Sequence, residues 1–233
     1  MELYEVMRTT FAAREFTDDP LPDATLATIL DHARFAPSGG NRQGWHVIVV
    51  RERATREALA AAAAPAAKRY AAQVKLGESP WNTIDATKAD AATIEATPAP
   101  ARLIEPVLKA PVVLVVCVDL KVVASMDQQL DRVGIISGAS IYPFAWNILL
   151  AARHEGFGGT ITTLAVANCS TGLRFSRDSG FTGLPSGITA QTATWGGMPR
   201  TDFSFGSCAT ASVVMVPPKP SCLAASRMFQ ANG

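Results

Sequence analysis

Apolar residues recur along the chain with spacings that predict both helices and buried strands. The spacing i, i+3, i+4, i+7 predicts helices over residues 2–13 and 22–33. Two runs that are apolar almost throughout, residues 45–50 and 111–119, predict strands covered on both faces. The segment GGTITTLAV, which begins at Gly158, predicts a third strand. The pattern therefore indicates a chain that combines helices with buried strands.

The longest predicted helix covers residues 127–155 and is apolar around most of its circumference. Pro143 is expected to kink this helix, and Gly156 is well suited to end it in the left-handed conformation. A helix that is apolar nearly all round lies at the centre of a fold or in a subunit interface. A second long helix is predicted over residues 52–72, interrupted by Pro65.

Two segments show no steady period. Residues 73–105 carry proline, glycine and asparagine, and an irregular segment of this length inside a compact domain is often a lid. From Cys169 onward, aspartate and glutamate become rare while serine, threonine and glycine take over. We therefore divide the chain into a compact domain, residues 1–168, and an atypical C-terminal segment of the same domain, residues 169–233. That segment could be an arm that crosses to a partner subunit, a disordered tail or the product of a reading-frame error.

Composition and charge narrow the class of protein. A chain of 233 residues, 48% hydrophobic and 18% charged, can form one domain with a sizeable core. A formal net charge of +1 gives no reason to expect nucleic acid or an acidic membrane as a partner. The chain has no membrane-length apolar run, no pattern of a secretory signal and no C-x-x-C pair among its four cysteines. We therefore expect a cytoplasmic protein with no membrane span, metal site or disulfide framework.

A short polar loop links the second predicted helix to the first predicted strand. Pro37 is expected to end the helix, since the residue before a proline is pushed out of the α region. Gly39–Gly40 let the backbone approach a bound group closely. Ser38, Asn41 and Gln43 add groups that both donate and accept hydrogen bonds. This set suits a planar heterocycle or a sugar phosphate, and it also suits an ordinary polar turn.

The loop and the strand after it carry a resemblance to a known family. The stretch APSGGNRQGWHVIVV resembles the nitroreductase family of FMN-dependent oxidoreductases, whose pattern is roughly A-P-S-x-x-N-x-Q-P-W. Ser38, Asn41, Gln43 and Trp45 match that pattern, and Gly44 stands in place of its proline.

The N-terminal segment FAAREFTDDPLPDATLATIL is similar to the family pattern R-R-S-x-R-x-F-x-x-x-P. Arg14, Phe16 and Pro20 match it. Residues 10–12 (TFA) replace the two leading arginines and the serine, so the basic groups that this part of the pattern supplies are absent. Arg8, just upstream, is a candidate substitute.

Two later segments add to the resemblance. AWNILLAARHEGFGGTITT is similar to the family's Q-N-x-x-L-A-A-x-x-x-G-L-G-x, and FTGLPSG followed by GGMP is faintly similar to L-G-I-P-x-G and G-x-P. The resemblance covers residues 1–165 well and residues 169–233 hardly at all.

The resemblance implies an α+β fold, with a mostly antiparallel central sheet wrapped by helices and a homodimer that buries the long helix at its interface. It also implies FMN at that interface, with backbone N–H groups after the long helix near flavin N5 and O4. A basic residue from the C-terminal region is expected near the phosphate. The residues assigned to the cofactor on this ground are Arg8, Thr10, Ala12, Arg14, Pro37, Ser38, Gly39, Asn41, Gln43, Gly158, Gly159 and Arg200.

The activity implied is NAD(P)H-dependent, ping-pong reduction of small nitroaromatic or quinone-like acceptors through flavin N5. The cofactor supplies this chemistry, so no catalytic side chain is assigned. Other flavin chemistry on the same scaffold stays open, namely enone reduction, dehalogenation or flavin fragmentation. A non-catalytic flavin-binding protein is a further alternative. A Rossmann fingerprint fails, because Ile161 stands where GFGGTI would need its last glycine.

Overall fold

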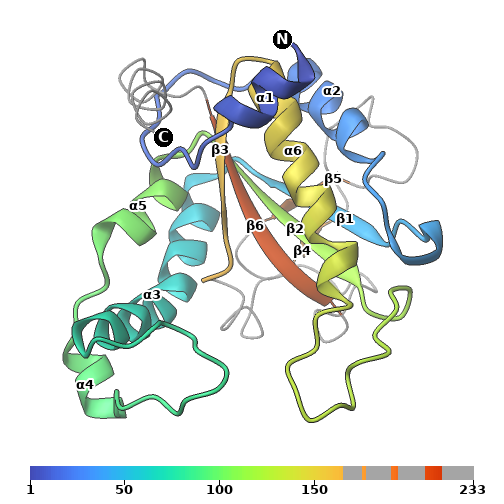
Figure 1. Ribbon diagram of the computed structural model, residues 1–233. Coiled ribbons are helices and arrows are strands. Elements are labelled where there is room, and N and C mark those ends of the chain that lie inside the picture. The colour runs from blue at the N-terminus through green and yellow to red at the C-terminus, as the bar shows by residue number, and fades with distance from the viewer. Residues whose placement is uncertain (165–174, 177–189, 194–207, 217–233) are drawn as a thin grey trace.

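The computed structural model describes residues 1–164, 175–176, 190–193 and 208–216. Its α-helices pack around one sheet (Figure 1). The helices are α1 Leu3–Thr9, α2 Asp23–Ala33, α3 Arg53–Lys75, α4 Ala91–Ala96, α5 Ala101–Lys109 and α6 Tyr142–His154, with short 3₁₀ turns η1 Gly39–Asn41 and η2 Gly138–Ser140. The strands are β1 Trp45–Val50, β2 Val112–Asp119, β3 Gly158–Thr162, β4 Phe175–Ser176, β5 Ala190–Ala193 and β6 Cys208–Val216.

The described strands form one sheet in the order β3-β6-β2-β1-β5-β4. All neighbours in it are antiparallel except β1 and β5, which are parallel. This arrangement confirms the expected α+β fold with a mostly antiparallel sheet. Strand β6 lies between β2 and β3, so residues 208–216 of the C-terminal segment belong to the central sheet. The division between residues 168 and 169 stays a prediction.

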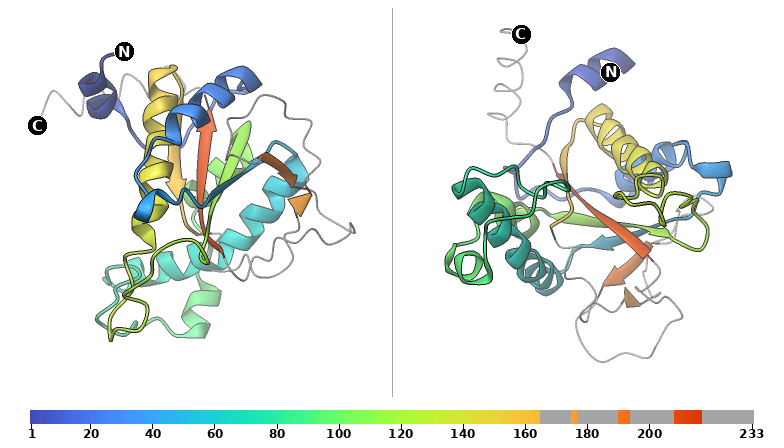
Figure 2. Two further views of the ribbon diagram at one scale, coloured as in Figure 1. Left: turned by 90° about the vertical axis from the view of Figure 1, so that its right-hand side faces the viewer. Right: turned by 60° about the horizontal axis from the view of Figure 1, so that its bottom comes forward.

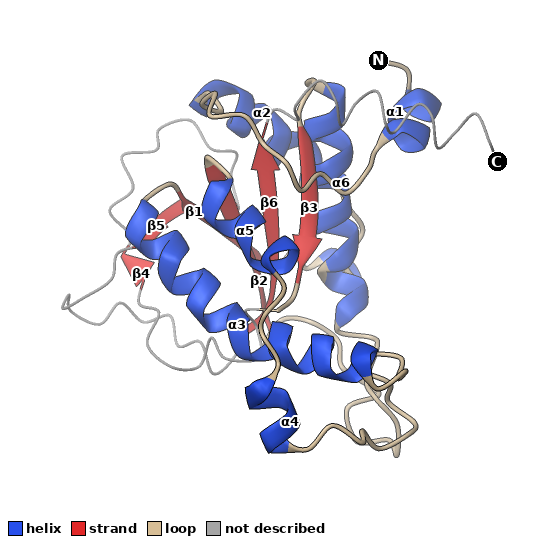
Figure 3. Cartoon of the chain, turned by 90° about the vertical axis from the view of Figure 1, so that its left-hand side faces the viewer, coloured by secondary structure: helices blue, strands red, loops and turns tan. Residues whose placement is uncertain are grey.

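Helices cover both faces of the sheet (Figure 2). On one face, α2 and α6 pack on side chains such as Trp45, Val47 and Val49. On the other face, α3 and α5 cross the sheet (Figure 3) and pack on side chains that include Ile48 and Val50. Alternate residues of β1 thus enter opposite cores, which explains why the strand is apolar almost throughout. Within the described residues, no helix is long and apolar enough to span a bilayer.

The prediction of one helix over residues 127–155 is wrong. Helix α6 starts only at Tyr142, and residues 120–137 form a non-helical loop. Pro143 lies in the first turn of α6 and does not kink it, because a missing N–H is tolerated at that position. Gly156, with φ of 86°, confirms the predicted helix end.

Two further predictions about helices need correction. Pro65 does not interrupt α3, which runs on to Lys75. Ala63 packs in the core that includes residues of β1 and β2, and Ala66 and Ala67 are also buried, so packing offsets the loss of one helical hydrogen bond. The segment 73–105, predicted to be irregular, contains α4 and the start of α5.

Candidate functional site

The polar loop between α2 and β1 is held closed by its own side chains. The Ser38 hydroxyl accepts the Gln43 backbone N–H at 3.0 Å, and the Gln43 amide donates to the Asn41 Oδ1 at 3.2 Å. Gly40, Asn41 and Gln43 have φ values of 62°, 51° and 50°. A left-handed glutamine is uncommon, and strain of this kind is found at binding sites. Pro37, Gly39, Asn41 and Gln43 are exposed and therefore accessible to a ligand.

The loop is fixed against the start of α6 and the segment before it. The Gly39 N–H donates to the Ser140 hydroxyl at 3.3 Å, and the Arg42 guanidinium donates to the Val122 carbonyl at 3.1 Å. Below the loop, the Trp45 indole N–H donates to the Ser140 carbonyl. The Trp45 ring stacks on Phe144 with centroids 4.7 Å apart. The loop is thus a rigid feature at the N-terminal end of α6.

A second group of predicted residues meets at the other end of α6. Ala12 pairs with Gly159 in an isolated parallel bridge, and the Ala13 N–H donates to the Gly159 carbonyl at 3.0 Å. The exposed Arg14 guanidinium donates to the Ala12 carbonyl at 3.3 Å. Gly158 and Gly159 are buried in β3. The structure thus brings the N-terminal segment and the glycine pair together.

The remaining predicted residues of the N-terminal segment, Arg8 and Thr10, lie in the last turn of α1 and directly after it. The Thr10 hydroxyl donates to the Val6 carbonyl at 2.7 Å, and Arg8 is exposed in the last turn of α1. A residue that the sequence analysis did not assign, Arg153, donates from Nε to the Thr9 hydroxyl at 3.0 Å. Its position in AARHEG was visible in the sequence, but its contact with Thr9 was not. Arg200 lies outside the described residues.

The two groups of residues lie at opposite ends of α6. One group contacts Ser140, just before the helix, and the other contacts Gly159, just after it. A helix of 13 residues is about 20 Å long. Within one chain, the polar loop and the N-terminal segment are therefore well separated.

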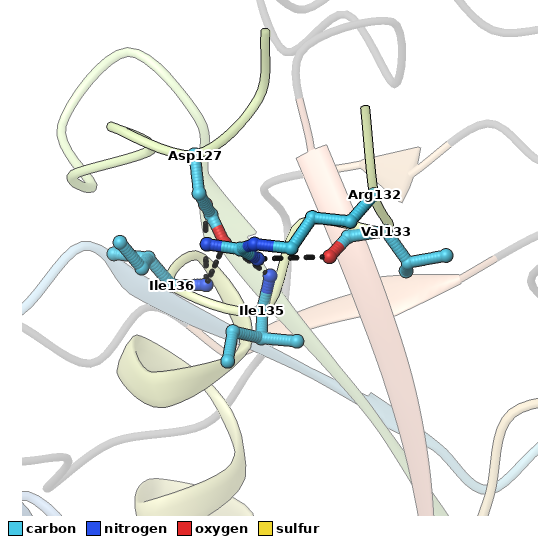
Figure 4. A network of polar contacts seen from close by, with 5 residues as sticks. All are labelled: Asp127, Arg132, Val133, Ile135 and Ile136. Carbon is cyan, nitrogen blue, oxygen red and sulfur yellow. Dashed lines mark hydrogen bonds and ion pairs between the residues drawn. The ribbon is translucent and has the colours of Figure 1, made fainter. Parts of the chain in front are cut away.

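The loop of residues 120–137 lies beside the polar loop and is organised by Asp127 (Figure 4). The side chain of Asp127 is only 3% exposed. Its Oδ2 accepts the backbone N–H groups of Ile135 at 2.6 Å and Ile136 at 3.2 Å, and the Arg132 guanidinium at 3.0 Å. The hydrogen bond from the Ile135 N–H is the main cause that lowers the pKa of Asp127. The hydrogen bonds from Arg132 and Ile136 lower this pKa further, while burial acts in the opposite direction.

This loop presents apolar side chains to solvent. Ala124 approaches the position that a Cβ of Gly39 would occupy to within 3.7 Å, so the two loops are in contact. The exposed apolar residues of the loop are Leu120, Met126, Leu130, Val133 and Ile135.

Comparisons with known proteins agree with this fold and order of segments. The Nitroreductase family profile matches residues 7–165. The "NADH dehydrogenase" of Thermus thermophilus is 46% identical over 50 residues, which are 22% of this chain and 24% of that protein. A second relative, from Archaeoglobus fulgidus, is 40% identical over 52 residues, which are 22% of this chain and 30% of that protein. The chain thus aligns with less than a third of either curated relative.

Solved structures are similar over nearly the whole chain. A BluB-like flavoprotein from Clostridium difficile 630 is 18% identical with a TM-score of 0.56, covering 94% of this chain and 91% of its own. A protein from Desulfovibrio desulfuricans, solved in complex with FMN, is 16% identical with a TM-score of 0.54, covering 94% and 87%. At these identities the likeness shows the fold. Because the family profile spans more than half of the sequence, this protein belongs to the nitroreductase family.

Proposed function

We propose that this protein binds FMN and uses NAD(P)H to reduce small nitroaromatic or quinone-like acceptors. The observation that carries the proposal is the pair of segments typical of the family, one an exposed polar loop in a strained conformation and the other the N-terminal segment bridged to β3. Bound FMN would supply the hydride chemistry at N5, and the protein would orient it.

The residues present fit a flavin. Ser38, Asn41 and Gln43 offer neutral donors and acceptors on an accessible loop, which suits the carbonyls and ring nitrogens of isoalloxazine. Arg14 offers an exposed guanidinium that bonds Ala12, the residue bridged to Gly159. A guanidinium suits phosphate or the pyrimidine end of the ring. No side chain is assigned to acid or base catalysis.

We also propose that the protein acts as a homodimer. The polar loop and the N-terminal segment are about 20 Å apart along α6, so a second copy is needed to bring one of each to a single flavin. Tyr142 and Trp146, four residues apart on α6, are 50% and 45% exposed, while Phe144 and Ile148 are fully buried. An exposed aromatic stripe on a helix marks an interface.

The loop of residues 120–137 supports the proposal that the acceptor is an apolar molecule. Its exposed side chains adjoin the polar loop that would hold the flavin. Flat apolar molecules such as quinones and nitroaromatics suit a wall of this kind, because contact removes apolar surface from water.

The proposal is tested with the purified full-length protein. We expect a yellow protein whose flavin absorbance persists through gel filtration and is released as FMN on denaturation. We also expect NADH or NADPH oxidation that depends on added benzoquinone or nitrobenzene. A colourless protein that does not bind added FMN would contradict the whole proposal. A yellow protein that does not oxidise NAD(P)H would contradict the proposed reductase activity and support only flavin binding.

A further inference from the structure

Arg153 is a buried cation without an acidic partner among the described residues. It lies in the last turn of α6 and is only 9% exposed. Its Nε donates to the Thr9 hydroxyl at 3.0 Å, and Arg153 takes part in none of the ion pairs between described residues. A neutral hydroxyl satisfies one N–H of the guanidinium and supplies no counter-charge. The terminal nitrogens of Arg153 are not among the described buried side-chain atoms that lack a partner, so they reach solvent and are accessible to a ligand.

A buried charge of this kind is costly unless an anion accompanies it. Buried charges in proteins are paired or bind ions, because removing them from water is unfavourable. The carbonyls at the C-terminal end of α6 offset part of this cost, since they carry partial negative charge. They do not replace a full counter-charge, so the arrangement points to an anionic group that the described chain does not contain.

The position of Arg153 indicates which anion this is. Thr9 immediately precedes residues 10–12, where the family pattern has two arginines and a serine and this chain has Thr-Phe-Ala. Ala12, at the end of that segment, is bridged to Gly159. Helix α1 and the C-terminal end of α6 lie side by side (Figures 1 and 2). Arg153 therefore contacts, from another element, the residue that immediately precedes the positions of the missing arginines.

We propose that Arg153 binds the phosphate of FMN in place of the two N-terminal arginines that this chain lacks. The inference rests on the proposed function, since it takes FMN as the ligand. A guanidinium can bind a phosphate through two parallel N–H···O bonds, and the bond to Thr9 fixes the orientation of the side chain.

The test compares FMN with riboflavin, which has the same ring but no phosphate. Dissociation constants are measured on flavin-free protein by quenching of flavin fluorescence. In Arg153→Gln, we expect the Kd for FMN to rise about tenfold or more, as for a lost charged hydrogen bond, and the Kd for riboflavin to change little. Arg53→Gln is the matched control, because Arg53 is an exposed arginine of α3, and it should change neither value.

Two further variants keep the test decisive if Arg153→Gln does not fold, as judged by circular dichroism. Arg153→Lys keeps the charge and loses the paired N–H groups, so its FMN affinity should fall between wild type and the glutamine variant. Thr9→Val removes the oxygen that orients Arg153, so it should also weaken the binding of FMN more than the binding of riboflavin. Selective loss of FMN affinity in these two variants supports the proposal, and unchanged or equal losses for both ligands overturn it.

The wild-type protein separates this inference from the function on which it rests. If wild type binds neither flavin, the proposed function fails. If it binds FMN and riboflavin with equal affinity, the flavin assignment stands and the assignment of Arg153 to the phosphate is wrong.

Discussion

The carboxylate of Asp127 accepts the backbone N–H of Ile135 at 2.6 Å, across eight residues of a loop that has no regular secondary structure. The bond closes the loop beside the polar segment Ser38–Gln43. The same carboxylate also binds the guanidinium of Arg132, so one buried acid fixes most of the loop.

We expect Asp127→Asn to loosen this loop, because a neutral amide oxygen accepts hydrogen bonds from Arg132 and the two backbone N–H groups more weakly than an ionised carboxylate does. Trypsin should then cleave after Arg132 several-fold faster than in wild type. Asp131→Asn is the control, since Asp131 is an exposed acid of the same loop. Equal cleavage of Asp127→Asn and wild type would show that the carboxylate does not hold the loop.

The lowered pKa of Asp127 also predicts a pH dependence. The folded state favours the ionised carboxylate, so its contribution to the free energy of unfolding is present above the ordinary pKa of aspartate, about 3.9. It is lost as the pH falls through the lower pKa of the folded state. Urea unfolding from neutral pH into this acid range should therefore show the stability gap between wild type and Asp127→Asn closing as the carboxylate is protonated.

The double variant Ser38→Ala/Asn41→Ala should weaken FMN binding at least about tenfold, because each lost hydrogen bond to a buried polar group costs about 1–3 kcal/mol. Thr28→Ala provides a control, since its hydroxyl bonds only within α2 in the described structure. Fluorescence titration of flavin-free protein measures both. Full flavin occupancy in the double variant would show that the polar loop does not contact the cofactor.

Arg14→Ala should weaken the binding of FMN and the binding of riboflavin to the same extent. Since we assign the phosphate to Arg153, the exposed guanidinium of Arg14, which bonds Ala12, is assigned to the pyrimidine end of the ring. The titration used for Arg153 measures this directly. A loss of affinity confined to FMN would instead assign Arg14 to the phosphate.

A charge on the exposed face of α6 should separate the proposed dimer. Trp146→Glu is expected to elute as a monomer and to hold less flavin, because a buried carboxylate without a partner opposes association. Leu108→Glu is a control with a similar change on α5, where Leu108 is 38% exposed. Light scattering after gel filtration distinguishes the two states. A Trp146→Glu dimer with full flavin content would place the interface elsewhere.

The sequence by itself determined the features that depend on neighbouring residues. Strand β1 was predicted with the bounds that the structure shows, and β2 to within one residue, because an uninterrupted apolar run suits a strand buried on both faces. Gly156 was recognised as a helix end because the left-handed conformation favours glycine. The polar loop was found in the same way, since its proline, glycines and amides stand close together.

Tertiary structure decided what depends on distant residues. Residues 127–141 carry enough apolar side chains to resemble a helix, but the Asp127 carboxylate takes up backbone N–H groups that a helix would use, and a side-chain acceptor can compete in this way. The contact of Arg153 with Thr9 joins residues 144 positions apart. No local pattern encodes such a contact, because it exists only once α1 has packed on the end of α6.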